Sequence, residues 1–466
     1  MKNFHRVLIP VLILLLLLAL ALTPPLLAGV LDLQQADALR AASPAQAAQM
    51  YESAAQHLPW RADLWEKAGL AALAGRNPDL AVRLLKKAPG LSATGRLALG
   101  DALFRAGNKP AALEQWERLR VDGLGSAPLY NRLGHAYLEL GNYDSAIEAF
   151  DLAQKLDARD ADSRYMLGLL LATRNPQEAL QPLLQSARLN PALDATVQDL
   201  RHGLNVALLS ASAAAQLTGA GKALVALNAW TLGKEAFSNA IKADPRYALG
   251  WAWLGEAEQM LKEDGLPELD RSLALDPDSA EIHGLRAVYW MRADDFQKAR
   301  DEFQSAADLE PSNPGWQVSL GDAIARTGDV PGGLEHYQRA VELSPRDASF
   351  WRLLANFTVD YNYGVKEAGF PAALQARALA PDDPQNTVTL GRVYFASGDL
   401  ASAEAFWLKA LGTEPDLPAA HLYLAVLYLQ KGNNSAAYPH LIQARDLDPT
   451  GPYGAQAQRM IDQYFP

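Results

Sequence analysis

Glycine and alanine recur along this 466-residue chain at a nearly constant interval, and this feature restricts the fold more than any other. Most successive members lie 34 residues apart, and the exceptions are intervals of 31, 53, 32 and 36 residues. Glycine inside a helix costs about 1 kcal/mol relative to alanine, so its recurrence needs a packing reason. We expect a second helix backbone to cross closely at each position. The positions are Gly69, Gly100, Gly134, Gly168, Gly221, Gly255, Ala287, Gly321, Ala355, Gly391 and Ala425.

A series of prolines marks the end of most of these repeating units. Within a unit, apolar residues at three- and four-residue spacing fill two stretches, which predicts two helices. A proline just past the second stretch stops that helix and begins the next turn. The prolines are Pro59, Pro191, Pro245, Pro277, Pro311, Pro345, Pro381, Pro415 and Pro449. The chain is therefore expected to be all-α, with neighbouring helix pairs stacked so that each buries the apolar face of the next.

The unit that begins at Ala127 contains LYNRLGHAYLELGNYDSAIEAFDLA, which closely resembles the consensus of the tetratricopeptide repeat (TPR). Its one departure is Ala158 in the place of the final proline. The units around Gly321, Gly391 and Ala425 resemble the consensus in the same register, and the repeats extend from about Pro44 to Pro449. The resemblance implies a right-handed superhelical solenoid of antiparallel helix pairs. It also implies a protein-binding role with no enzymatic activity and no cofactor.

The spacing divides the chain into five predicted segments. The segment 192–213 is read as a spacer helix, because Leu193 to Ala213 exceeds the repeat period by about one helix. The last segment is read as a helix that covers the apolar face of the final repeat, as repeat arrays require. In chain order the segments are an N-terminal anchor (1–31), a first array of about four and a half repeats (32–191), the spacer (192–213), a second array of about seven repeats (214–449) and the capping helix (450–466).

The N-terminal segment carries no charge between Arg6 and Asp32, and Val7 to Leu22 is almost purely aliphatic. A helix from Val7 to Leu27 would span about 31 Å, close to the hydrocarbon thickness of a bilayer. Pro24 and Pro25 would end it near the far interface. We predict one transmembrane helix, with its N-terminus in the cytoplasm and the repeats on the extracytoplasmic side.

A cleaved signal peptide is the alternative, and it would give a secreted or periplasmic protein. Leu26 or Leu27 stands where signal cleavage needs a small residue, which favours the uncleaved anchor.

Composition excludes several kinds of site. The chain has no cysteine, so it has neither disulfides nor thiolate metal sites, and its net charge of −11 disfavours nucleic acid as a partner. No two of the eight histidines have the spacing of a helical metal motif, although His421 and His440 could approach each other within one repeat. We expect packed or solvated histidines and no metal. Most tryptophans occupy repeat core positions; Trp60, Trp253 and Trp316 do not.

The family resemblance places candidate partner-binding residues on the concave face, mainly on the first helix of each pair. These are Asn131, His135, Tyr165, Asp322, Arg326, Arg352, Asn356 and Arg392. The Lys and Asn pattern with which some TPR proteins clamp a terminal carboxylate is absent. The arginines, with Asn356, lie in three adjacent repeats and could accept acidic groups of a peptide or glycan, the alternative being an ordinary solvated face.

These observations favour a membrane-tethered scaffold or adaptor that assembles protein complexes at the cell envelope. Its partner would be an extended peptide or a helix lying in the concave groove. The alternative is an accessory or regulatory subunit of an envelope enzyme, such as a glycosyltransferase, or of an export machine.

Overall fold

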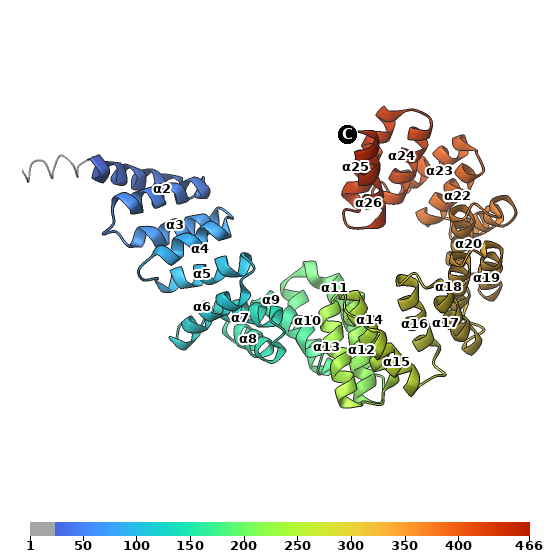
Figure 1. The fold of residues 1–466 in the computed structure, drawn as a ribbon, viewed down its shortest axis with the longest axis horizontal. Coiled ribbons are helices and arrows are strands. Elements are labelled where there is room, and N and C mark those ends of the chain that lie inside the picture. The colour runs from blue at the N-terminus through green and yellow to red at the C-terminus, as the bar shows by residue number, and fades with distance from the viewer. Residues whose placement is uncertain (1–23) are drawn as a thin grey trace, which may run out of the picture. The chain divides into compact units, whose positions relative to one another are not determined.

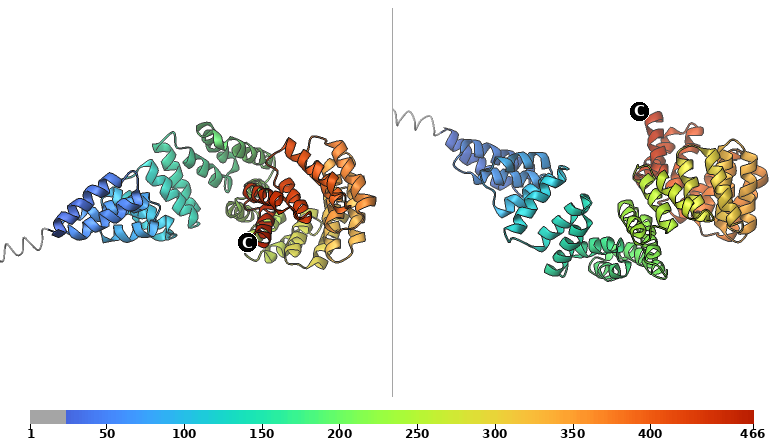
Figure 2. Two further views of the ribbon diagram at one scale, coloured as in Figure 1. Left: turned by 90° about the horizontal axis from the view of Figure 1, so that it is seen from above. Right: turned by 60° about the horizontal axis from the view of Figure 1, so that its bottom comes forward.

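The structure is a computed structural model that describes residues 24–466, and within this range the chain forms helices and no strands. The chain divides into two compact units, one ending at Asn239 and the other beginning at Ala240. In each unit successive helices lie side by side as antiparallel pairs (Figures 1 and 2). The predicted all-α stack of helix pairs is therefore confirmed for the described residues, while the hand of a superhelix stays a prediction.

The first unit opens with a helix over residues 24–39. Its further helices are α2 (Pro44–His57), α3 (Asp63–Ala74), α4 (Pro78–Lys87), α5 (Ala93–Arg105), α6 (Lys109–Val121), α7 (Ala127–Glu139), α8 (Tyr143–Leu156), α9 (Ala161–Ala172), α10 (Pro176–Leu189), the 3-10 turn η1 (Pro191–Leu193), α11 (Asp194–Ala207) and α12 (Ala213–Ala226). The boundary between the units falls within α13 (Trp230–Ala243).

The second unit continues the same alternation. It contains α14 (Ala248–Met260), α15 (Leu266–Leu275), α16 (Ala280–Arg292), α17 (Phe296–Leu309), α18 (Pro314–Arg326), α19 (Val330–Leu343), α20 (Ala348–Asp360), the π-helical turn η2 (Val365–Gly369), α21 (Phe370–Leu379), α22 (Pro384–Ala396), α23 (Leu400–Thr413), α24 (Pro418–Gln430), α25 (Asn434–Leu447) and α26 (Pro452–Tyr464).

The small residues of the repeat leave room for contacts of two kinds. At Gly321 the neighbour is backbone, because a Cβ there would lie 2.8 Å from the carbonyl oxygen of Gly333. At Gly134 it is a side chain, because a Cβ would lie 2.7 Å from the ring of Phe150, which is fully buried. Close backbone crossing, expected at every position, therefore explains only part of the series. The rest is explained by a bulky side chain of the second helix lying over the first.

Short polar side chains at the turns begin many of the helices. Asp295 accepts a hydrogen bond from the backbone N–H of Lys298 at 3.2 Å, and Asp383 accepts one from that of Gln385 at 2.8 Å. Such caps satisfy N–H groups that have no partner within the helix. Gly141 and Gly328, which follow first helices, have φ of 73° and 104°, a region that favours glycine.

The predicted membrane segment falls largely on residues 1–23, outside the described residues. Within residues 24–466 no helix is both long and apolar enough to cross a membrane. Helical structure runs from Pro24 to Leu39 and so continues past Leu27, where the membrane helix was expected to end; the prediction that the prolines end a preceding helix concerns residues outside the described range. Proline is tolerated in the first turn of a helix, where its missing N–H would have no intrahelical acceptor.

The segment read as a spacer contains α11, which packs within the first unit. Val197, Leu200 and Leu204 of α11 are buried in one apolar cluster with Leu183 of α10 and Leu224 of α12. Inside this unit α11 thus continues the stack of apolar contacts. The division into arrays at 192–213 stays a prediction, and the two compact units meet elsewhere, at residues 239 and 240.

The C-terminal helix α26 lies against the last repeat. Ala457 and Ile461 are buried in a cluster with Leu422 and Ala425 of α24 and Leu441 of α25. This apolar surface would otherwise face water, so α26 closes the C-terminal end of the stack.

Candidate protein-binding surface

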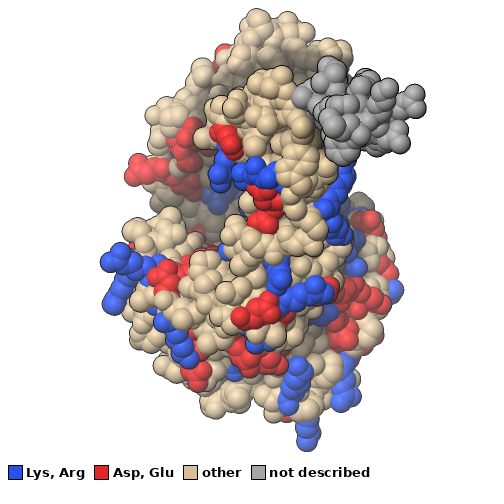
Figure 3. All heavy atoms as spheres, turned by 90° about the vertical axis from the view of Figure 1, so that its left-hand side faces the viewer, with Lys and Arg blue, Asp and Glu red and all other residues tan. Residues whose placement is uncertain are grey.

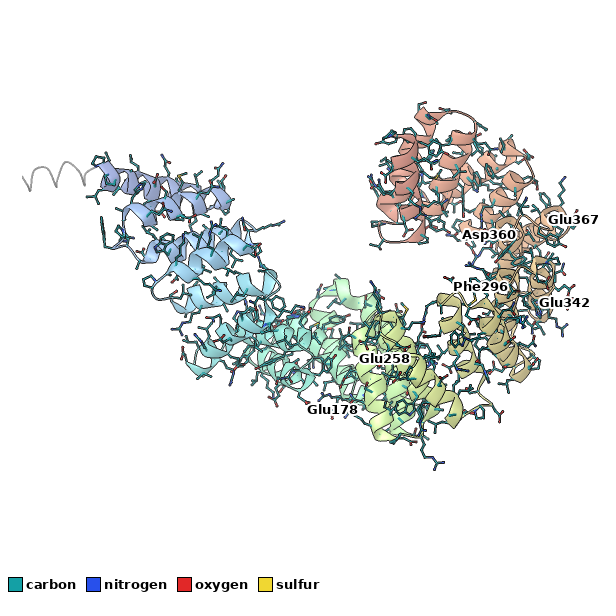
Figure 4. The ribbon with its side chains drawn as sticks, in the orientation of Figure 1. Glu178, Glu258, Phe296, Glu342, Asp360 and Glu367 are labelled. Carbon is teal, nitrogen blue, oxygen red and sulfur yellow. The ribbon has the colours of Figure 1, made fainter. Side chains whose placement is uncertain are left out.

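In the second unit, the first helices α16 and α18 lie on the side toward which the unit curves, and their partners α17 and α19 lie outside them (Figure 1). The first helices α20, α22 and α24 continue the row, with α20 in contact with α22 and α22 in contact with α24. We call this side of the second unit its inner face. Figure 4 shows Asp360, at the end of α20, on the inner face, and Glu342 and Glu367 on the opposite, outer side. All three side chains are exposed. A side chain on a first helix of this unit can therefore meet a partner that lies along the inner face.

Two predicted residues of the first unit, Asn131 and His135 on α7, share one carboxylate. The side-chain amide of Asn131 donates to Asp162 Oδ2 at 2.8 Å, and His135 Nε2 lies 2.9 Å from the same oxygen. These hydrogen bonds, chiefly the one from His135, hold the pKa of Asp162 below its usual value, against the effect of burial. The pairing joins α7 to α9 and occupies both predicted residues.

A shallow hollow of about 190 Å³ adjoins this cluster and is lined by Asp101, Phe104, Arg105, Trp116, Arg132 and His135. Arg132 crosses it by donating two hydrogen bonds to Asp101, of 2.6 and 3.0 Å. Tyr165, predicted for the same surface, is half-buried on α9, and burial raises the pKa of its hydroxyl.

The three predicted arginines of the second unit do not share one open site. Arg352 donates to Asp383 Oδ2 at 2.6 Å. Arg392 donates to the side-chain oxygen of Asn356 at 2.8 Å and pairs with Asp360. Two of the three guanidinium groups are therefore already bound to carboxylates of a neighbouring first helix or of the turn before it.

Arg326 differs from the other two arginines, because it forms no ion pair among the described residues. It lies over the ring of Phe296, with the guanidinium carbon 5.4 Å from the ring centre. The two residues line a hollow of about 520 Å³ together with Ala293, Asp294, Asp295, Gln297 and Thr327. A guanidinium on an aromatic face keeps its N–H groups available for an acceptor.

Asp322 lies on the same helix as Arg326, one turn before it. Burial raises the pKa of its carboxyl group, and the charge of Arg326 and a hydrogen bond with Tyr361 partly oppose this shift. The carboxyl group therefore stays partly shielded from water on this face.

Sequence reasoning missed an ion pair that joins α14 to α16, the first helices of two neighbouring repeats. Arg292 donates two hydrogen bonds to the carboxylate of Glu256, of 2.6 and 2.7 Å, and Glu256 is only 5% exposed. A signal was present in the sequence. Glu256 follows the small residue Gly255 directly, and Arg292 stands five residues after Ala287 in the next unit.

The described part of these surfaces contains no candidate metal-binding site. Within residues 24–466 no three His, Cys, Asp or Glu side chains gather in a way that could hold a metal ion. His421 and His440, which the sequence suggested as neighbours, do meet, with their Nδ1 atoms 2.8 Å apart. Since His421 Nε2 also bonds to the carbonyl oxygen of Pro415 at 2.9 Å, the pair is occupied by structural hydrogen bonds.

Models of the tetratricopeptide repeat match residues 127–160, 259–314, 291–348 and 388–452. Among curated proteins, the chain is 26% identical over 178 residues to BBSome complex member BBS4 of Bos taurus, covering 36% of this chain and 34% of that protein. It is 33% identical over 90 residues to tetratricopeptide repeat protein 21A of Homo sapiens, covering 19% of this chain and 7% of that protein. The chain thus spans about a third of the first relative's length and far less of the second's.

Two solved structures are similar along most of the chain. The crystal structure of yeast Tom70 is 16% identical, with 93% of this chain and 95% of that chain covered and a TM-score of 0.43. The crystal structure of the APC/C hetero-tetramer Cut9-Hcn1 is 15% identical, with 91% and 94% covered and a TM-score of 0.37. Both scores lie below 0.5, so neither likeness carries an argument about function. From the matched repeats and the stacked helix pairs together, we conclude that residues 127–160, 259–348 and 388–452 of this chain are tetratricopeptide repeats.

Proposed function

We propose that this protein is a scaffold or adaptor that binds other proteins along the inner face of its second unit. The observation that carries the proposal is that the first helices of five successive pairs, α16, α18, α20, α22 and α24, form a row on this face. Partly buried apolar side chains, such as Val288 of α16 and Phe395 of α22, lie on the same helices as members of the arginine and carboxylate pairs described above. A face of this composition offers an apolar contact and hydrogen-bonding groups to an extended segment or a helix.

Arg326 supplies a specific contact for such a partner. Arg352 and Arg392 are paired with carboxylates, whereas Arg326 forms no ion pair among residues 24–466. An acidic group of a bound peptide or glycan would therefore pair with Arg326 first. The curated relative BBS4 is named as a member of a complex, which agrees with a role in assembly.

The test is photo-crosslinking in intact cells from single positions in the second unit. A photoreactive amino acid at Asp360, which lies on the inner face in Figure 4, or at Arg326, the predicted contact on α18, probes the inner side, and one at Glu342 or Glu367 probes the outer side. We expect one and the same partner to crosslink from both inner positions and from neither outer position. The scaffold proposal fails if crosslinks form equally from both sides. It also fails if the purified chain alone turns over a sugar-nucleotide or peptide substrate.

We further propose that the N-terminal segment tethers the protein to a membrane, with the repeats on the extracytoplasmic side. The support is the absence of charge between Arg6 and Asp32, with Lys2 and Arg6 before it. A tether would raise the effective concentration of the protein for partners at the same membrane. Partners in envelope assembly are the corresponding expectation.

Fractionation of cells, followed by sequencing of the mature N-terminus, tests the tether. We expect the protein to stay in the membrane fraction after alkaline washing and to keep residues 1–31. A protein released into the soluble fraction, with its N-terminus beyond Leu27, would show a cleaved signal peptide and contradict the tether.

A further inference from the structure

The helix over residues 24–39 has one packed face and one free face. Gly29 and Ala36 are buried against the first repeat, and a Cβ at Gly29 would lie 2.7 Å from the side chain of Leu58. On the free face, Leu27, Val30 and Leu31 are 63%, 43% and 48% exposed. Their spacing of three and four residues places them side by side on one surface of the helix.

The exposed residues of the free face change from apolar to polar within one helical turn. After Leu31 the exposed residues are Gln34, Gln35, Asp37 and Ala38, and no further large apolar side chain is exposed before the helix ends at Leu39. Two turns of this helix thus present an apolar surface to solvent, and the later turns present a polar one. A boundary of this kind is expected where a helix passes from an apolar medium into water.

The opposite end of the chain provides a comparison. The helix α26 also has a free face, and its exposed residues include Gln456, Arg459, Asp462 and Gln463, with Tyr464 as its one large exposed ring. A polar outer face is what a repeat array needs where its last helix meets water. The exposed leucines and valine at the N-terminal end depart from this rule.

An exposed tryptophan stands at the same end of the first repeat. Gly29 packs against His57 and Leu58, at the end of α2, and Trp60 follows two residues later with 64% of its surface exposed. Trp60 was one of three tryptophans outside the core positions of the repeat. Tryptophan is enriched where a membrane meets water, because its ring is apolar and its N–H is polar.

These residues fit a bilayer better than a protein partner. A stable protein interface uses roughly 20 to 30 residues on each side, whereas this patch comprises only Leu27, Val30, Leu31 and Trp60. The patch also follows directly on the uncharged sequence 7–23. Figure 3 views the molecule from this end; basic side chains lie directly below the grey atoms, and charges of both signs are mixed over the lower part of the view.

We propose that Leu27, Val30, Leu31 and Trp60 form a membrane-facing patch, with the bilayer interface at the level of Leu31 to Gln34. The inference rests on the proposed tether and adds to it. The first repeat is seated on the lipid surface and is not separated from it by a flexible linker. The described helix runs from residue 24 into the first repeat, which fixes the distance between the two.

The absence of cysteine makes a direct test possible, because one introduced cysteine is the only labelling site. The full chain would carry an environment-sensitive fluorophore at Leu27→Cys, Val30→Cys, Leu31→Cys or Trp60→Cys. Matched controls are Ala38→Cys on the same helix, Gln456→Cys on α26, and Val121→Cys, an exposed apolar position on α6. Each protein is placed in phosphatidylcholine and phosphatidylglycerol vesicles that contain a doxyl-lipid quencher.

We expect lipid quenching at the four patch positions to exceed that at the three controls by about twofold or more. Equal quenching at patch and control positions would overturn the inference. So would a label at Leu27 or Leu31 that is shielded without lipid and insensitive to the quencher, since another protein surface would then cover the patch.

Flotation of the same samples separates the two proposals. If the chain does not float with the vesicles, the tether itself is wrong, and the membrane-facing patch with it. If the chain floats while the patch labels remain in water, the tether holds and the patch inference alone is wrong.

Discussion

The contact between Gly134 and Phe150 shows why a small residue recurs in several of the repeats. Phe150 is fully buried, and its ring lies so close to Gly134 that a Cβ would approach it to 2.7 Å. Trp116 lies over Gly100 and Trp407 over Gly391 in the same way. The glycine and the ring are therefore one packing unit, repeated along the chain.

Substitution of Gly134 should follow the size of the new side chain. We expect Gly134→Ala to lower the free energy of unfolding by about 1 to 3 kcal/mol, because overpacking outweighs the helix propensity of alanine, and Gly134→Leu to lower it further. Gly412→Ala is the control, because nothing lies within 4 Å of a Cβ at that helical position. It should be neutral or stabilising by up to about 1 kcal/mol. Urea unfolding followed by circular dichroism measures the differences; equal melting of the two Gly134 variants would contradict this packing.

Two histidines of the second unit should make its stability depend on pH. Burial lowers the pKa of His336 and of His440, and the neighbouring His421 lowers that of His440 further. A histidine whose folded pKa lies below its unfolded value of about 6.5 stabilises the fold above pH 6.5, and this contribution is lost as the pH falls through the folded pKa. We therefore expect the urea midpoint to decrease from about pH 7.5 to about pH 5.

A double variant isolates this contribution from that of the carboxylates. His336→Gln with His440→Gln keeps a hydrogen-bond donor near Gln317 and His421 but removes both titrations. The decrease in the midpoint should be smaller in this variant than in the wild type. The same pH dependence in both proteins would contradict the assignment.

At the scale of the element, four first helices of the second unit are tied to the turn before them by one recurring hydrogen bond. The residue four positions before the small residue donates a ring N–H to the carbonyl oxygen of the proline that ended the previous pair. Trp251 donates to Pro245 and Trp351 to Pro345, both at 2.9 Å, and His421 meets Pro415 at 2.9 Å. This bond sets the angle at which a new pair leaves the preceding one.

Trp351→Phe removes the donor and keeps most of the ring. We expect it to lower the free energy of unfolding by about 1 kcal/mol, the usual net value of such a bond. Trp65→Phe is the matched control, because Trp65 stands at the same place before Gly69 and its ring N–H makes no hydrogen bond among the described residues. It should change stability by less than about 0.5 kcal/mol. Equal losses in the two variants would show that ring size, and not the hydrogen bond, matters.

At the scale of the whole chain, the helix pairs were predictable because periodicity and prolines report local geometry. Gly134 marks a place where only a small residue fits. Pro345 marks the end of a helix. The pairing of Arg352 with Asp383 was not predictable, because it depends on the conformation of long side chains across a repeat boundary. The helix over residues 24–39 was not predicted, because proline can begin a helix as well as end one.

The inner face of the second unit is the feature on which the proposed function depends. Val288 and Phe395 lie on two of its first helices, and both are apolar side chains that are only partly buried. Glu342 and Glu367, on the outer side, provide charge variants of the same unit that leave this face unchanged.

The most direct test is the affinity of the crosslinked partner, once purified, for variants of the two sides. Val288→Glu and Phe395→Glu place a charge in the apolar part of the inner face, and Glu342→Lys and Glu367→Lys reverse a charge on the outer side. Circular dichroism verifies that each variant is folded. We predict that each inner variant weakens binding about tenfold or more, a change of about 1.4 kcal/mol, and that each outer variant changes it less than about twofold. Binding that survives both inner variants and is lost in the outer ones would contradict the account.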